Sequence, residues 1–72
     1  MYDYDDIERM VKTFVYQQYE EAKKNPDSAF HLRGIAYGAV QFATNYLFPC
    51  FNHDLNDWWA NEMWSKFTDL IS

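Results

Sequence analysis

The sequence predicts an all-α fold, a three-helix bundle with short connections and antiparallel neighbouring helices. Apolar residues recur at three- and four-residue spacing along three segments, and no run alternates with the period of two that an amphipathic strand requires. Short stretches that contain proline and asparagine separate these segments. With 72 residues, the chain is expected to form a single domain spanning residues 1–72.

The first predicted helix spans about residues 3–24. Acidic residues crowd its beginning, and Lys23 and Lys24 occupy its last turn, an arrangement that the helix macrodipole favours. The apolar residues recur on one side, as expected for an amphipathic helix. We expect its core-facing side to consist of Ile7, Met10, Val11, Phe14, Gln18 and Ala22.

The second predicted helix spans about residues 26–48. Pro26 fits the first position of a helix, with Asn25 as the N-cap, and Pro49 ends the helix. Its apolar side is broader than that of the first helix. We expect the core-facing residues to be Leu32, Ile35, Ala36, Ala39, Val40, Phe42, Ala43, Tyr46 and Leu47.

The third predicted helix spans about residues 54–71, with Asn52 or Asp54 as its N-cap. Its apolar residues follow one another at strict spacing, which defines a narrow stripe. The expected core-facing residues are Leu55, Trp59, Met63, Phe67 and Leu70.

Composition and charge argue against several classes of binding partner. The formal net charge of −5 argues against nucleic acid and anionic membrane surfaces. A helix-turn-helix DNA reader is discounted as well, because Lys66 is the only basic residue of the third helix. A lone cysteine, Cys50, cannot form an internal disulfide, and the acidic N-terminal residues do not resemble a secretion signal, so we expect a cytoplasmic protein.

The second helix lacks charge where a solvent-facing helix should carry it. Residues 34–53 contain no Asp, Glu, Lys or Arg, although 24% of the chain is charged. Two glycines one turn apart each cost roughly 1 kcal/mol of helix stability relative to alanine, so a compensating gain is expected. The side of the helix opposite the predicted core carries Gly34, Tyr37, Gly38, Gln41 and Asn45.

Three interpretations of this uncharged side compete. The segment could span a membrane, but polar residues dilute it, and we expect no membrane association. The helix could instead be central and covered by the aromatic side chains of the other two. We favour the third interpretation, a surface for self-association or for a protein partner, because small chains without disulfides gain little from their own core. Three aromatic residues outside the core stripes extend the expected interface: Tyr16, Trp58 and Trp64.

Few residues of the sequence suggest catalysis or metal binding. Cys50 and His53 place a thiol and an imidazole three residues apart, but a nucleophile also needs an orienting group and an oxyanion site. A structural zinc site needs four ligands, and besides these two residues only His31 is of the soft ligand types, so we expect no metal and no cofactor.

The leading hypothesis is a non-enzymatic, acidic, helical protein–protein interaction module that self-associates through the uncharged side of the second helix. The alternative from another class is a small enzyme or metal-binding protein centred on Cys50 and His53. A third hypothesis is an accessory protein of a phage or mobile element that occludes another protein, suggested only by size, acidity and surface aromatic residues.

Overall fold

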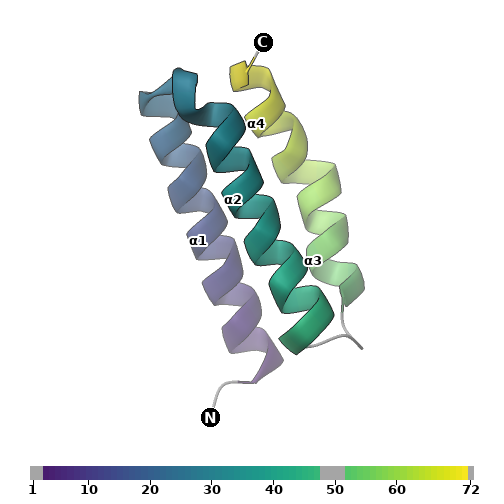
Figure 1. Cartoon of the computed structure of the whole chain (residues 1–72). Helices are drawn as coiled ribbons and strands as arrows, with labels where there is room; N and C mark the ends of the chain where they lie inside the picture. The colour runs from purple at the N-terminus through teal and green to yellow at the C-terminus, as the bar shows by residue number, and fades with distance from the viewer. Residues whose placement is uncertain (1–2, 48–51, 72) are drawn as a thin grey trace.

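The structure, a computed structural model, describes residues 3–47 and 52–71. These residues form three helical arms that run up, down and up, with the N-terminus at one end of the bundle and the C-terminus at the other (Figure 1). The molecule is elongated, with extents of 36 × 21 × 16 Å. The predicted all-α three-helix bundle with antiparallel neighbours is thereby confirmed for the described part of the chain.

The first arm is helix α1, Tyr4–Lys24. Its N-cap is Asp3, whose carboxylate accepts a hydrogen bond from the backbone N–H of Asp6 over 2.9 Å. The carboxylate of Asp6 in turn accepts from the backbone N–H of Asp3, which completes a capping box. The acidic residues that begin the sequence thus satisfy backbone donors that the helix leaves unpaired.

The second arm consists of three consecutive helical segments. It begins with a short 3-10 turn, η1 (Pro26–Ser28), and continues as α2 (Ala29–Phe42) and the π-helical segment η2 (Ala43–Leu47). Asn25 is the N-cap residue, but its side chain donates to the hydroxyl of Ser28 rather than to the helix backbone. The predicted end of the helix at Phe48 lies outside the described residues.

The third arm is continuous through α3 (Asn52–Trp58), the π-helical segment η4 (Trp59–Met63) and α4 (Trp64–Ile71). It begins two residues earlier than the predicted start at Asp54. The predicted stripe of this arm is correct, because four of its five residues are buried and Leu70 packs against them. Each arm buries one side toward a common axis. The buried core consists of Val15, Ala22, Ala29, Leu32, Ala36, Val40, Ala43, Leu55, Trp59, Met63 and Phe67.

The predicted core sides of the first two helices were wrong for several large residues. On α1, Met10 and Phe14 are exposed, and Val15 is buried in their place. On the second arm, Phe42 is 57% exposed and Tyr46 is 76% exposed. Each helix carries apolar residues over more of its circumference than the core can cover, so the stripes predicted from periodicity were too broad and included residues that the core does not reach. Ile35 and Leu47, also predicted as core, are likewise exposed.

Candidate interaction surface

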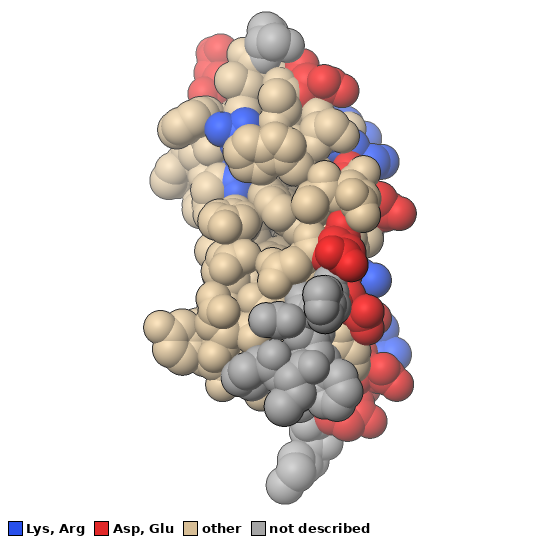
Figure 2. Space-filling view, turned by 90° about the vertical axis from the view of Figure 1, so that its right-hand side faces the viewer, with Lys and Arg blue, Asp and Glu red and all other residues tan. Residues whose placement is uncertain are grey.

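The side of α2 and η2 that faces away from the core forms a surface without Asp, Glu or Lys side chains. We call it the α2 outer face and define it by Phe30, Gly34, Ile35, Tyr37, Gly38, Gln41, Phe42 and Asn45. In Figure 2 the left-hand side is mostly tan below the top of the molecule, with blue atoms in its upper part and red atoms at its upper edge, whereas most other acidic and basic residues lie along the right. Between Ala29 and Leu47, Arg33 is the only Asp, Glu, Lys or Arg residue.

The two glycines of this face are not explained by contacts within the chain. A Cβ atom added to Gly34 or to Gly38 would meet no other atom within 4 Å. Neither glycine has a positive φ, so the backbone does not require a residue without a side chain. Both residues therefore reduce helix stability and leave an open gap on the surface.

An aromatic groove borders the face on the side of the third arm. Tyr37 lies 46% exposed against Trp59, with ring centroids 5.7 Å apart, and Trp59 is in edge contact with Trp64. The groove has a volume of about 520 Å³, and its walls are almost wholly apolar. Its lining consists of Phe30, Arg33, Gly34, Tyr37, Trp59, Ala60 and Trp64.

Arg33 lies in this groove between two aromatic rings. Its guanidinium carbon is 4.0 Å from the ring centroid of Trp64 and 5.2 Å from that of Phe30. The guanidinium also donates a hydrogen bond of 3.0 Å to the hydroxyl of Thr68. Among the described residues Arg33 makes no ion pair with an acidic side chain. The guanidinium of Arg33 therefore contacts α4 at the edge of the α2 outer face.

A second groove borders the face on the side of α1, and sequence reasoning missed it. It holds about 280 Å³, and its walls are purely apolar. The sequence does indicate this groove, because α1 carries a second stripe of apolar residues beside the buried one. Periodicity alone does not distinguish that exposed stripe from the stripe that faces the core. The lining consists of Ile7, Met10, Val11, Phe14, Ala39, Phe42, Ala43 and Leu47.

Two of the predicted interface residues take part in a polar bridge. The side-chain amide nitrogen Nε2 of Gln41 donates to the side-chain oxygen Oδ1 of Asn56 on α3 over 3.0 Å. The side-chain amide nitrogen Nδ2 of Asn45 donates to the side-chain oxygen Oε1 of Gln41 over 3.2 Å. Neutral amides therefore serve here to join α2 to α3, which gives part of the uncharged side a role within the subunit.

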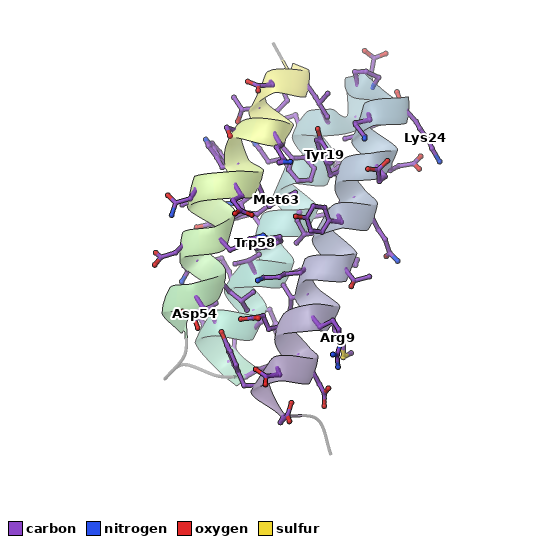
Figure 3. All side chains as sticks on the ribbon, turned by 180° about the vertical axis from the view of Figure 1, so that it is seen from behind. Arg9, Tyr19, Lys24, Asp54, Trp58 and Met63 are labelled. Carbon is purple, nitrogen blue, oxygen red and sulfur yellow. The ribbon has the colours of Figure 1, made fainter. Side chains whose placement is uncertain are left out.

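Tyr16 and Trp58 lie on a different surface from the other predicted interface residues. Their rings meet edge to face with centroids 5.8 Å apart, which joins α1 to α3. The ammonium of Lys12 lies 5.3 Å from the ring of Trp58. Figure 3 shows Trp58 from behind, on the side of the molecule opposite α2. The structure brings together Gly34, Tyr37, Gly38, Gln41, Asn45 and Trp64, and leaves Tyr16 and Trp58 apart from them.

The residues considered for chemistry are only partly within the described chain. Cys50 and the side chain of His53 lie outside it, and His31 is exposed on α2. Across the described residues, no three His, Cys, Asp or Glu side chains are close enough to hold a metal ion. None of the helices described is both long and apolar enough to cross a membrane.

One perturbed ionisable group lies at the opposite end of the bundle from η1. Burial raises the pKa of the Tyr4 phenol well above its usual value, and hydrogen bonds to the carboxylates of Glu8 and Asp54 add to the effect. The phenol links the beginning of α1 to α3, and nothing in this arrangement resembles a nucleophile or a base poised for a substrate.

No protein-family model, curated protein or solved structure matches the chain. What bears on function is therefore the chemistry of the molecule's own surface.

Proposed function

We propose that the chain is a non-enzymatic helical interaction module that self-associates through the α2 outer face. The observation that carries this proposal is the pair of glycines over open space on the α2 outer face, which carries no Asp, Glu, Lys or Arg. Each glycine lowers helix stability by roughly 1 kcal/mol relative to alanine. Close packing of another helix backbone against the two glycines would offset this loss.

The surroundings of the glycines support the same proposal. Exposed aromatic and aliphatic side chains flank them on both sides, and two apolar grooves extend the surface toward α1 and toward α4. Large contiguous apolar surfaces on small domains are typical of interaction sites, and aromatic residues dominate the energies of such sites. Most acidic and basic residues lie away from this face, along the right-hand side of Figure 2, where they would remain hydrated on association.

The size of the chain favours a second copy as the partner. The core consists of small and medium residues on α1 and α2, and only the third arm contributes several large ones. A core of this size in a chain of 72 residues without a disulfide supplies on the order of 3–5 kcal/mol, and association is a common way to add to it.

The test compares one added charge on each side of the molecule. Gly38→Glu places a carboxylate on the α2 outer face, where a side chain has room in the isolated subunit. Thr13→Glu adds the same charge to an exposed position of α1 and is the matched control. In sedimentation, Gly38→Glu should lower the associated fraction at least tenfold while Thr13→Glu leaves it unchanged. A monomeric mass for the unmodified chain, or equal effects of the two variants, would overturn the proposal.

A further inference from the structure

The groove between α2 and the third arm has the size and the walls of a site for a small organic molecule. Its volume of about 520 Å³ falls within the roughly 300–1,000 Å³ that is typical of ligand pockets. Trp59 forms a buried part of its wall, and three further rings, at least 43% exposed, surround it: Phe30, Tyr37 and Trp64. Aromatic walls of this kind favour an aromatic ligand, because rings gain energy from stacked and edge-to-face contacts.

The charge in the groove favours a ligand with one negative charge. Arg33 is the only Asp, Glu, Lys or Arg among the described residues that line the groove, and no ion pair joins it to an acidic side chain of the described chain. Its contact with Trp64 and its hydrogen bond to Thr68 fix the guanidinium in place. A guanidinium has five N–H donors in a planar fork that matches a carboxylate, so donors beyond the one given to Thr68 remain for a ligand.

Gly34 adds room to the groove. It lines the groove, and a Cβ atom added to it would meet no other atom within 4 Å. Glycine is suited to positions where a ligand approaches the backbone closely. Gly38 lies one turn further along α2 in equally open surroundings, but it does not line the groove. The two glycines therefore allow the same substitution to be made inside and outside the groove.

We infer that this groove binds a small aromatic monocarboxylic acid, whose ring packs over Gly34 against Tyr37 and whose carboxylate accepts hydrogen bonds from Arg33. A carboxylate is preferred to a phosphate monoester, because the groove supplies one cation and such a phosphate carries nearly two negative charges. The inference goes beyond the proposed function and does not rest on it, since the whole lining belongs to one subunit. Because the groove and the α2 outer face share residues, binding is tested in dilute protein that sediments at 8.7 kDa.

The first test titrates three probes that share a phenyl ring and a short chain and differ in charge: phenylpropanoate, phenylpropanamide and phenylpropylammonium. Tryptophan emission reports binding, because Trp59 and Trp64 line the groove. Trp58 contacts Tyr16 on another surface and adds a constant background. We expect phenylpropanoate to give a saturable change and to bind about tenfold tighter than the neutral amide, because a charged acceptor strengthens the hydrogen bonds. Equal binding of the three probes, or no saturable change with phenylpropanoate, would overturn the inference.

The second test compares Gly34→Leu with Gly38→Leu. Both substitutions raise helix propensity, so both chains should remain folded, as circular dichroism would show. Gly34→Leu fills the groove and should abolish the response to phenylpropanoate, whereas Gly38→Leu should leave its dissociation constant unchanged. Equal effects of the two variants would overturn the inference.

A third variant, Arg33→Gln, separates the carboxylate contact from the aromatic contact. It should weaken binding of phenylpropanoate about tenfold, to the level of the amide, because a neutral side chain replaces the charged donor. Unchanged binding of phenylpropanoate to Arg33→Gln would contradict the role of the guanidinium. Sedimentation of the unmodified chain without a probe tests self-association separately, so failure of one proposal is distinguishable from failure of the other.

Discussion

The guanidinium of Arg33 lies 4.0 Å from the ring centroid of Trp64, and this contact joins the second arm to the third. The same guanidinium donates to the hydroxyl of Thr68 one turn further along α4. A half-buried arginine that stacks on an indole and makes a side-chain hydrogen bond contributes more than a solvated surface charge. Arg33 is therefore a structural link of the bundle as well as a cation beside the α2 outer face.

We expect Arg33→Gln to lower the free energy of unfolding by about 1–2 kcal/mol, because it removes both the stacking and the hydrogen bond. Arg9→Gln is the matched control. Arg9 is exposed, and its ion pair with Asp6 is solvated, so the loss there should stay below about 0.5 kcal/mol. Urea denaturation at one fixed protein concentration measures both. Equal losses for the two variants would show that Arg33 does not link α2 to α4 in this way.

Truncation of two phenylalanines should affect different properties, the folding stability for Phe67 and the association for Phe42. Phe67 is fully buried, so Phe67→Ala should cost about 3–5 kcal/mol and leave little folded protein. Phe42 is mostly exposed, so Phe42→Ala should cost less than about 1 kcal/mol in the dissociated chain and should weaken association. Circular dichroism on heating and sedimentation measure the two effects. A large loss of monomer stability for Phe42→Ala would place that side chain in the core instead.

Gly38→Ala should raise the folding stability of the isolated subunit and weaken its association. The added Cβ meets open space, so the isolated subunit should gain about 0.5–1 kcal/mol from the higher helix propensity of alanine. The same Cβ stands in the gap that the second copy is expected to fill, so the dissociation constant should rise severalfold. Thermal unfolding of dilute protein and sedimentation of concentrated protein distinguish the two. Tighter association of the variant would contradict a close approach at Gly38.

The phenol of Tyr4 predicts a dependence of stability on alkaline pH. Its pKa is raised in the folded chain, first by burial and then by Glu8 and Asp54, so folding favours the neutral form. This stabilisation is complete below the unfolded pKa of about 10 and is lost as the pH rises through the higher folded value. Above pH 10, the free energy of unfolding of the unmodified chain should therefore fall more steeply than that of Tyr4→Phe.

The matched control for this pH dependence is Tyr46→Phe, which removes a hydroxyl from an exposed position. This variant should follow the unmodified chain over the whole range. Guanidinium denaturation at a series of pH values from neutral to strongly alkaline measures all three proteins. Parallel curves for the unmodified chain and Tyr4→Phe would show that the phenol does not favour its neutral form on folding.

The sequence allowed prediction of three helices and of the buried stripe of the third arm. That stripe was predictable because Leu55, Trp59, Met63 and Phe67 follow at four-residue spacing, with mostly polar residues between them. The spacing of the first two helices was ambiguous. On α1, Phe14 and Val15 are neighbours and equally suited to the core, so only the position of the other arms decides which is buried.

The uncharged side of the second helix was also predictable, because the absence of charge is a property of the sequence alone. Its details required the structure. The bridge from Gln41 to Asn56 joins residues of two arms, and the stacking of Arg33 on Trp64 does the same. The contact of Tyr16 with Trp58 explains two aromatic residues within the subunit, and no pattern along either helix indicates that pairing.

Sedimentation equilibrium of the unmodified chain over a wide range of concentration tests self-association most directly. The α2 outer face predicts a mass that rises from 8.7 kDa in dilute solution toward that of a dimer, with a single dissociation constant describing all concentrations. A mass of 8.7 kDa at every concentration, up to the millimolar range, would contradict it.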